Sequence, residues 1–183
     1  MGRTALGIGL ACAILAACSG SSVEGYLPPS FSRTDTVAFT SDDPVSAGLA
    51  MELAKRGYRV MERARLQSFV QPHAQTRSAL LKDEQYTQAG QIANVRYLIS
   101  LSGVLLRRDP DKPVSVNVKI LDVRSGELVG AISYTNSSMG RMGSPFDEMH
   151  KKSSSVVARE IAQYIDRLSR PSGDLLREDA GLK

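Results

Sequence analysis

The fold is indicated most clearly by residues 114–135, VSVNVKILDVRSGELVGAISYT. Apolar side chains alternate with polar ones from Val114 to Ile120, and this period of two is typical of a half-buried strand. Residues 124–127 (RSGE) predict a tight turn, because Gly126 can adopt a positive φ without strain. Residues 128–135 have the composition of a returning strand. The stretch therefore predicts an antiparallel hairpin.

Shorter patterns on both sides of the hairpin predict the other elements. Asp42 or Asp43 can cap a helix that begins near Pro44, and Gly57 is a natural end for it. Further strands are expected over residues 36–39, 58–62 and 97–106, and further helices over 63–69, 80–93 and 144–170. The order β-α-β-α-α-β-β-β-α predicts an α/β fold, a small mixed sheet of about five strands flanked by helices.

The N-terminus has the pattern of an export signal. Arg3 is followed by the uncharged, apolar residues 5–17. A bilayer-spanning helix needs about twenty apolar residues, so this run is too short to span, but it has the length of a signal-peptide core. The next feature resembles the lipobox of bacterial lipoproteins, formed here by Leu15, Ala16, Ala17 and Cys18.

The lipobox resemblance implies that residues 1–17 are removed as a signal peptide and that Cys18 carries palmitate-type acyl chains. The chain has two cysteines, and Cys12 would leave with the leader, so no internal disulfide is expected. Ser19 follows the cysteine, and by resemblance to the sorting rule of Gram-negative lipoproteins this implies transfer to the outer membrane. The alternative is a soluble secreted protein with a chance cysteine.

The remaining chain divides into three parts by composition. Residues 18–34 are rich in Ser, Gly and Pro and predict a tether that reaches at most about 50 Å. Its Tyr26, Leu27 and Phe31 either dock, on the domain or on a neighbouring subunit, or are chance apolar residues of a linker. Residues 35–170 predict one domain, and the polar residues 171–183 predict a disordered tail.

Three stretches of the predicted domain resemble CsgG-like and FlgO-like bacterial lipoproteins. They are residues 57–66 (GYRVMERARL), 95–103 (VRYLISLSG) and 116–129 (VNVKILDVRSGELV). The penicillin-binding-protein activator LpoB and the N-terminal domain of TolB share this fold. The resemblance covers roughly residues 35–168 and implies a periplasm-facing domain with a small mixed sheet between helices.

The sequence offers little for catalysis. His73 and His150 are the only histidines, and neither has a cysteine or carboxylate at metal-ligand spacing. Neither a GxGxxG nor a Walker-type phosphate motif occurs. We therefore expect no enzyme activity, no cofactor, no metal site and no small-molecule substrate.

Charge also argues against nucleic acid. The 23 basic and 19 acidic residues leave a net charge of +4, and only 5% of the chain is aromatic. One group of basic residues, the Arg-rich strip, is either a solvated face or an interface: it comprises Arg56, Arg59, Arg63 and Arg65.

These features together predict a non-enzymatic outer-membrane lipoprotein. Its periplasmic domain is expected to be an assembly component of an envelope machine, such as a secretion or flagellar outer-membrane complex, and to bind protein partners or copies of itself. The alternative is an LpoB-like regulatory module that binds a peptidoglycan synthase.

Overall fold

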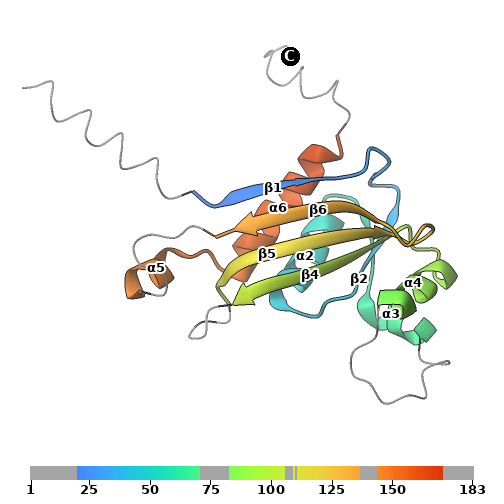
Figure 1. Cartoon of the computed structure of the whole chain (residues 1–183), viewed down its shortest axis with the longest axis horizontal. Coiled ribbons are helices and arrows are strands. Elements are labelled where there is room, and N and C mark those ends of the chain that lie inside the picture. The colour runs from blue at the N-terminus through green and yellow to red at the C-terminus, as the bar shows by residue number, and fades with distance from the viewer. Residues whose placement is uncertain (1–19, 71–82, 106–108, 110, 137–143, 171–183) are drawn as a thin grey trace, which may run out of the picture.

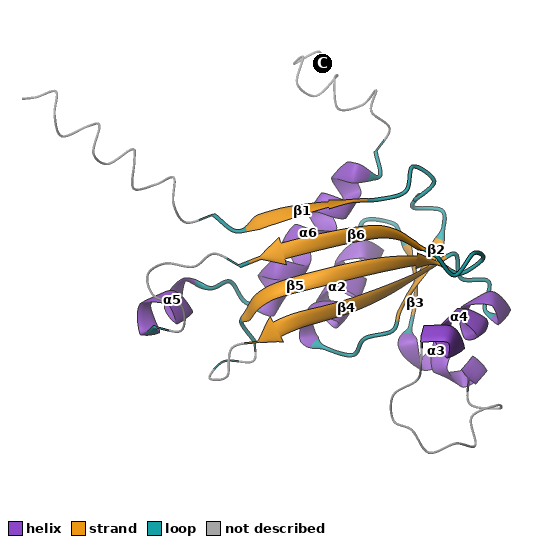
Figure 2. Ribbon diagram, viewed as in Figure 1, coloured by secondary structure: helices purple, strands orange, loops and turns teal. Residues whose placement is uncertain are grey.

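The computed structural model describes residues 20–70, 83–105, 109, 111–136 and 144–170. The strands are β1 (Ser22–Tyr26), β2 (Thr36–Phe39), β3 (Arg59–Met61), β4 (Tyr97–Leu105), β5 (Pro113–Asp122) and β6 (Leu128–Thr135). The helices are α2 (Pro44–Lys55), α3 (Arg63–Val70), α4 (Asp83–Ile92), α5 (Pro145–His150) and α6 (Ser154–Leu168). The strands form one sheet in the order β1-β6-β5-β4-β2-β3. The predicted class, a mixed sheet flanked by helices, is confirmed (Figure 2).

The hairpin that the sequence predicts is strands β5 and β6. They pair antiparallel with Val118 opposite Ile132. Gly126 in the turn has a φ of 72°, and its N–H donates to the carbonyl of Asp122 at 2.8 Å. The helix start at Pro44 is confirmed as well, because the Asp43 carboxylate accepts the N–H of Ser46 at 2.9 Å.

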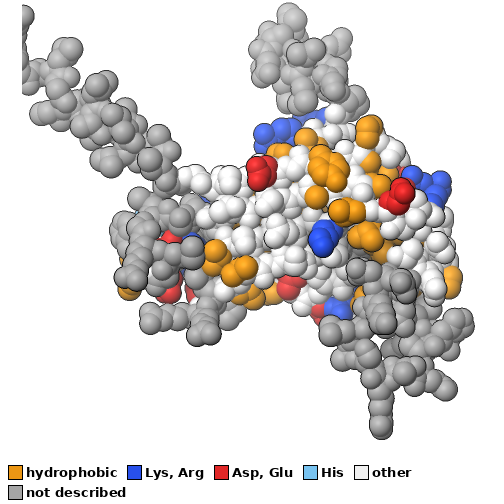
Figure 3. Space-filling view, viewed as in Figure 1, with side chains coloured by type: hydrophobic (Ala, Val, Ile, Leu, Met, Phe, Trp, Pro, Cys, Tyr) orange, Lys and Arg blue, Asp and Glu red, His pale blue; other side chains and the backbone are white. Residues whose placement is uncertain are grey.

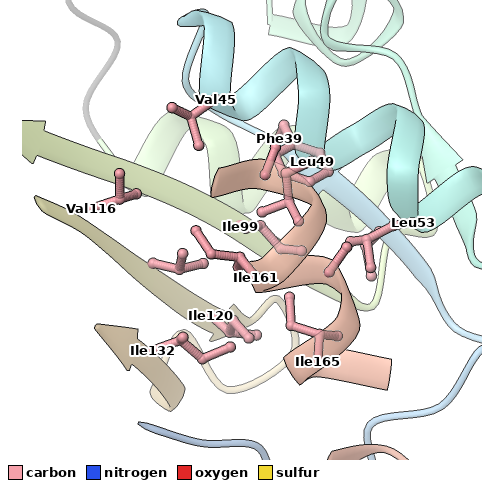
Figure 4. Close-up of a cluster of buried hydrophobic side chains, with 14 of the residues drawn as sticks. Phe39, Val45, Leu49, Leu53, Ile99, Val116, Ile120, Ile132, Ile161 and Ile165 are labelled. Atoms are coloured by element: carbon pink, nitrogen blue, oxygen red, sulfur yellow. The ribbon is translucent and has the colours of Figure 1, made fainter. Parts of the chain in front are cut away.

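The main hydrophobic core lies between one face of the sheet and helices α2 and α6. The helices contribute apolar residues at every fourth position, the spacing that puts side chains on one helix face. Figure 4 shows these side chains meeting those of the strands, among them Leu49, Leu53, Ile161 and Ile165 from the helices and Val116, Ile120 and Ile132 from the sheet. All seven are almost fully buried.

The opposite face of the sheet is covered over only part of its area. Helices α3 and α4 pack there, with Leu66 and Tyr86 against Leu98 of β4 and Ala38 of β2. In the described part of the chain no element covers β1, β6, β5 and the outer half of β4 on this side (Figure 1). We call this surface the open face, and its side chains are Ser100, Ser102, Val104, Ser115, Asn117, Lys119, Ala131, Ser133, Thr135, Ser22, Glu24 and Tyr26.

The segment expected as a tether over residues 18–34 contributes to the fold from Ser22 onward. β1 pairs antiparallel with β6 and becomes a sixth strand at the sheet edge. Phe31 is 3% exposed and its ring centroid lies 5.0 Å from that of Tyr97. Of the two readings of Tyr26, Leu27 and Phe31, docking on the domain is confirmed for Phe31 and Leu27, which pack on the main core, whereas Tyr26 is 54% exposed.

The single helix expected over residues 144–170 is two helices instead. Lys151 has an extended backbone with ψ of 136°, and α6 begins only at Ser154. The break has a physical cause in long-range hydrogen bonds. The N–H of Lys152 donates to Asn136 at 3.0 Å, and the N–H of Ser154 donates to the carbonyl of Asp111 at 2.7 Å. These bonds satisfy backbone groups that a continuous helix would have used internally.

Candidate functional site: the entry end of the domain

The chain enters the fold at one end of the sheet, which we call the entry end. There β1 and β5 begin and β4 and β6 end, and the pairing register places four residues in one row across these strands: Val104, Ser115, Thr135 and Ser22. Helix α5 lies at the same end (Figure 1). It is tied there because Lys112 Nζ donates to the carbonyl of Glu148 at 3.1 Å.

A polar network holds the entering chain at Ser21. The carboxylate of Glu160 on α6 accepts hydrogen bonds from Ser21 Oγ at 3.0 Å and from Lys152 Nζ at 2.5 Å. The hydroxyl of Tyr134 on β6 donates a hydrogen bond to the same carboxylate at 2.8 Å. Lys152 Nζ also donates to Ser21 Oγ at 2.7 Å. Ser21 is therefore fixed to both the sheet and α6 before β1 begins.

Asn136 joins three segments at the entry end. Asn136 is only 2% exposed. Nδ2 donates to the carbonyls of Pro113 at 2.8 Å and Lys152 at 2.9 Å, while Oδ1 accepts the N–H of Lys152. A buried amide with both ends satisfied is a rigid contact, so the end of β6, the start of β5 and the link between α5 and α6 keep fixed positions.

The network shifts the pKa values of its members. Burial opposes the ionisation of Glu160, but the hydrogen bonds from Lys152, Tyr134 and Ser21 together outweigh it and lower the pKa of Glu160. Burial is the main cause that raises the pKa of Tyr134, and its bond to Glu160 adds to that rise. At neutral pH the network consequently contains an ionised carboxylate at Glu160 and a neutral hydroxyl at Tyr134 that donates a hydrogen bond to it.

The contribution of Glu160 to stability should depend on pH. Since its pKa is lower in the folded chain than the ordinary 4.5, the stabilisation is present above that value and is lost as pH falls through the lower folded value. We expect Glu160→Gln to reduce the free energy of unfolding by about 1–2 kcal/mol at pH 7, because Tyr134 loses a charged acceptor and the partly exposed ion pair with Lys152 disappears. The difference from the parent chain should shrink toward pH 3.

Urea unfolding of residues 19–183, followed by circular dichroism at both pH values, measures this difference. The matched control is Glu24→Gln on the open face, an exposed carboxylate that should change the free energy of unfolding little at either pH. A Glu160→Gln difference that is the same at pH 7 and pH 3 would show that the charge of Glu160 does not stabilise the network.

The Arg-rich strip lies at the other side of the molecule, around the edge strand β3. Arg56 forms an ion pair with Glu52 at 2.6 Å, and Arg63 forms one with Asp42 at 3.0 Å. Arg59 and Arg65 are exposed and line a surface pocket of about 350 Å³ together with Thr36, Val60, Met61 and Glu62. Two of the four arginines are thus engaged in ion pairs, and two border this pocket.

Several predicted features fall outside the described residues. They are the signal peptide, the lipobox residues Leu15, Ala16 and Ala17, the lipidation site Cys18, the sorting residue Ser19, His73 and the tail 171–183. His150 lies exposed at the end of α5. Within the described ranges, no cluster of three or more His, Cys, Asp or Glu is arranged to hold a metal ion. None of the helices found there is both long and apolar enough to cross a membrane.

Sequence reasoning did not find the entry-end network. Its members come from four separate segments, at Ser21, Tyr134, Lys152 and Glu160, and only the fold brings them together. A weak signal was present in Glu160, a charged residue close to the apolar face of a strongly amphipathic helix. Such a residue usually has a partner.

The chain matches no known family model, and no curated protein matches its sequence. Among solved structures it is similar to the PelC dodecamer from Paraburkholderia phytofirmans, with 19% identity, a TM-score of 0.47, and 84% of this chain and 100% of that chain covered. The LpoB C-terminal domain from Salmonella enterica has 11% identity and a TM-score of 0.48, over 58% of this chain and 85% of that one.

A third similar structure is the lipoprotein GNA1162 from Neisseria meningitidis, with 13% identity, a TM-score of 0.41, and 75% of this chain and 98% of that chain covered. These likenesses concern the fold alone. Their low identities and TM-scores give no ground for transferring a function. The resemblance to CsgG-like and FlgO-like lipoproteins stays a prediction.

Proposed function

We propose that this protein is a non-enzymatic lipoprotein of the outer membrane whose folded domain faces the periplasm and serves as an assembly component of an envelope machine. The observation that carries the proposal is the short distance along the chain between the lipobox and the fold. Only three residues separate Cys18 from the first residue of β1, Ser22, and Ser21 is already bound by Glu160 and Lys152. The domain is thus built to begin where the lipid anchor would end.

The open face supports the assembly role. Eight of its twelve side chains are Ser, Thr, Asn or Ala, and few charged side chains are visible on this side of the molecule (Figure 3). Small uncharged side chains allow the surface of a partner to approach closely and cost little to desolvate. Within the described residues β1 and β3 are the two edge strands of the sheet, and edge strands can pair with another chain.

The non-enzymatic role is supported by the chemistry of the charged groups. The carboxylates with lowered pKa values, such as Glu160, Asp166 and Glu52, are each engaged in ion pairs with Lys or Arg. Ion pairs that keep carboxylates ionised are typical of structural contacts, whereas a general acid needs a raised pKa.

The alternative, an LpoB-like regulator of a peptidoglycan synthase, is less well supported. Such a regulator needs an arm long enough to bring its domain from the outer membrane to a synthase in the inner membrane. The chain from Cys18 to Ser22 spans at most about 14 Å when fully extended, because each residue adds about 3.5 Å. The length that the sequence suggested, up to about 50 Å, is reduced because β1 is part of the sheet.

The assembly role can be tested by the mass of the full-length protein extracted in detergent and measured by light scattering. We expect a mass corresponding to several copies, or a stable complex with another envelope protein. A cross-linker at Ser133→Cys on the open face should join the protein to another copy or to the envelope protein in the complex. A cross-linker at Gln163→Cys, exposed on α6, should not. A single-chain mass together with no cross-link from Ser133→Cys would contradict the proposal.

A further inference from the structure

The entry end carries exposed apolar side chains beside the point where the chain enters the fold. Val104 and Leu105 at the end of β4 are 59% and 48% exposed, and Met149 of α5 is 70% exposed. Val104 lies in the same row of the sheet as Ser22. Met149 is held near these residues through two contacts. The carbonyl of its neighbour Glu148 accepts a hydrogen bond from Lys112, and Pro113, which follows Lys112, pairs with Leu105.

We propose that the entry end lies against the lipid surface, with Val104, Leu105 and Met149 contacting the membrane and the β5–β6 turn pointing away from it. This inference rests on the proposed lipid anchor at Cys18, and it adds the orientation of the domain. The occupant of the apolar surface is the bilayer in which the anchor itself is inserted.

The length of the connecting chain argues for this occupant. From Cys18 to Ser22 the backbone reaches at most about 14 Å. The polar headgroup layer of a bilayer leaflet is roughly 6 Å thick, since the whole membrane is about 40–45 Å and its hydrocarbon core about 30 Å. A domain that begins so close to an acylated cysteine cannot be held far beyond the headgroups. Because Ser21 is bonded to Glu160 and Lys152, the entry end is the part of the domain that lies next to the headgroups.

Two of the lysines near the entry end are paired with carboxylates of the same chain. Lys152 is paired with Glu160 at 2.5 Å, and Lys112 lies 3.5 Å from Asp109, so these charges at the entry end compensate each other. The apolar side chains and the short connection therefore favour the membrane over a strongly charged partner. Long-range attraction to anionic lipid is not needed when a covalent anchor already holds the chain at the surface.

The test uses the full-length, acylated protein in vesicles of phosphatidylethanolamine and phosphatidylglycerol that contain lipids with nitroxide on the acyl chain. Val104→Cys and Met149→Cys each carry an environment-sensitive fluorophore. The control is Leu128→Cys, which is 51% exposed like Val104 but lies about 20 Å farther along the strands. With Cys18 acylated and Cys12 removed with the leader, the introduced cysteine is the one free thiol of the mature chain.

We expect the probes at residues 104 and 149 to shift to shorter wavelengths and lose most of their emission to the nitroxide, and the probe at residue 128 to do neither. Flotation of the vesicles separates the proposal of a lipid anchor at Cys18 from the proposal of the domain's orientation. Protein that fails to float contradicts the lipid anchor. Protein that floats while residue 128 is quenched equally, or while residues 104 and 149 are not quenched, overturns the orientation alone. A blue shift without quenching, together with cross-links between copies, would assign this surface to a second copy and also overturn it.

Discussion

Replacing Cys18 with serine should abolish acylation of the protein. In the proposed lipoprotein the sulfur of this residue is the attachment point of the lipid, and serine offers no thiol for the thioether. Each buried methylene of an acyl chain contributes about 0.8 kcal/mol to membrane attachment, so two or three chains make the attachment effectively permanent. Loss of the acyl chains should therefore change membrane attachment from complete to absent. We expect the variant to be either a soluble chain or one that keeps its leader, and in both cases to take up no labelled palmitate.

The matched control for this experiment is Cys12→Ser. Cys12 lies six residues before Cys18 in the apolar leader and is predicted to be removed with it, so this variant should keep its label and its membrane location. Metabolic labelling with palmitate and mass spectrometry of the mature N-terminus provide the measurement. Label that persists in Cys18→Ser, or an unmodified thiol at Cys18 in the parent protein, would contradict the anchor.

The parts of the fold that the sequence predicted are those specified by local pattern. The β5–β6 hairpin follows from alternation and one glycine, and α2 follows from a capping aspartate, a proline and apolar residues four apart. In each of these elements the signal lies within about twenty residues. The side chains on the buried faces of these elements form the observed core, as at Leu49 and Ile120.

The parts that were not predicted depend on contacts between distant segments. β1 has the sequence SVEGY, with one half-buried apolar residue, Val23, and it is a strand because its backbone pairs with β6 more than a hundred residues later. The break between α5 and α6 likewise depends on Asn136 and Asp111. The entry-end network could not be predicted for the same reason. Nothing in a local pattern places Ser21 beside Glu160.

Gly25 shows why β1 can join the sheet, and its replacement is expected to detach the strand. Its φ is +153°, and a Cβ at this position would overlap the carbonyl oxygen of Ala131 and lie 2.6 Å from the Cα of Ile132. Both are backbone atoms of β6, which cannot move aside without breaking the pairing with β5. Gly25→Val should therefore destabilise β1 by about 1–3 kcal/mol from strain, in addition to the loss of its pairing with β6.

Hydrogen exchange should reveal this change as lost protection at the backbone amides of residues 22–26, while amides of β5 that pair with β4 stay protected. The control is Gly20→Val, since a Cβ at Gly20 would meet nothing within 4 Å. It adds the same side chain to the same segment and should leave β1 in place. Equal protection of β1 in both variants would show that the close approach of Gly25 to β6 is not what holds the strand.

The same pair of variants links the fold to the proposed membrane orientation. If β1 detaches together with Ser21, the first residue held by the core becomes Leu27, and the chain from Cys18 can then extend to about 32 Å instead of about 14 Å. In acylated protein that carries Gly25→Val, a probe at residue 104 should lose much of its quenching by lipid nitroxide although the vesicles still float with the protein. Gly20→Val should retain the quenching, because the short connection that presses the entry end to the bilayer is unchanged.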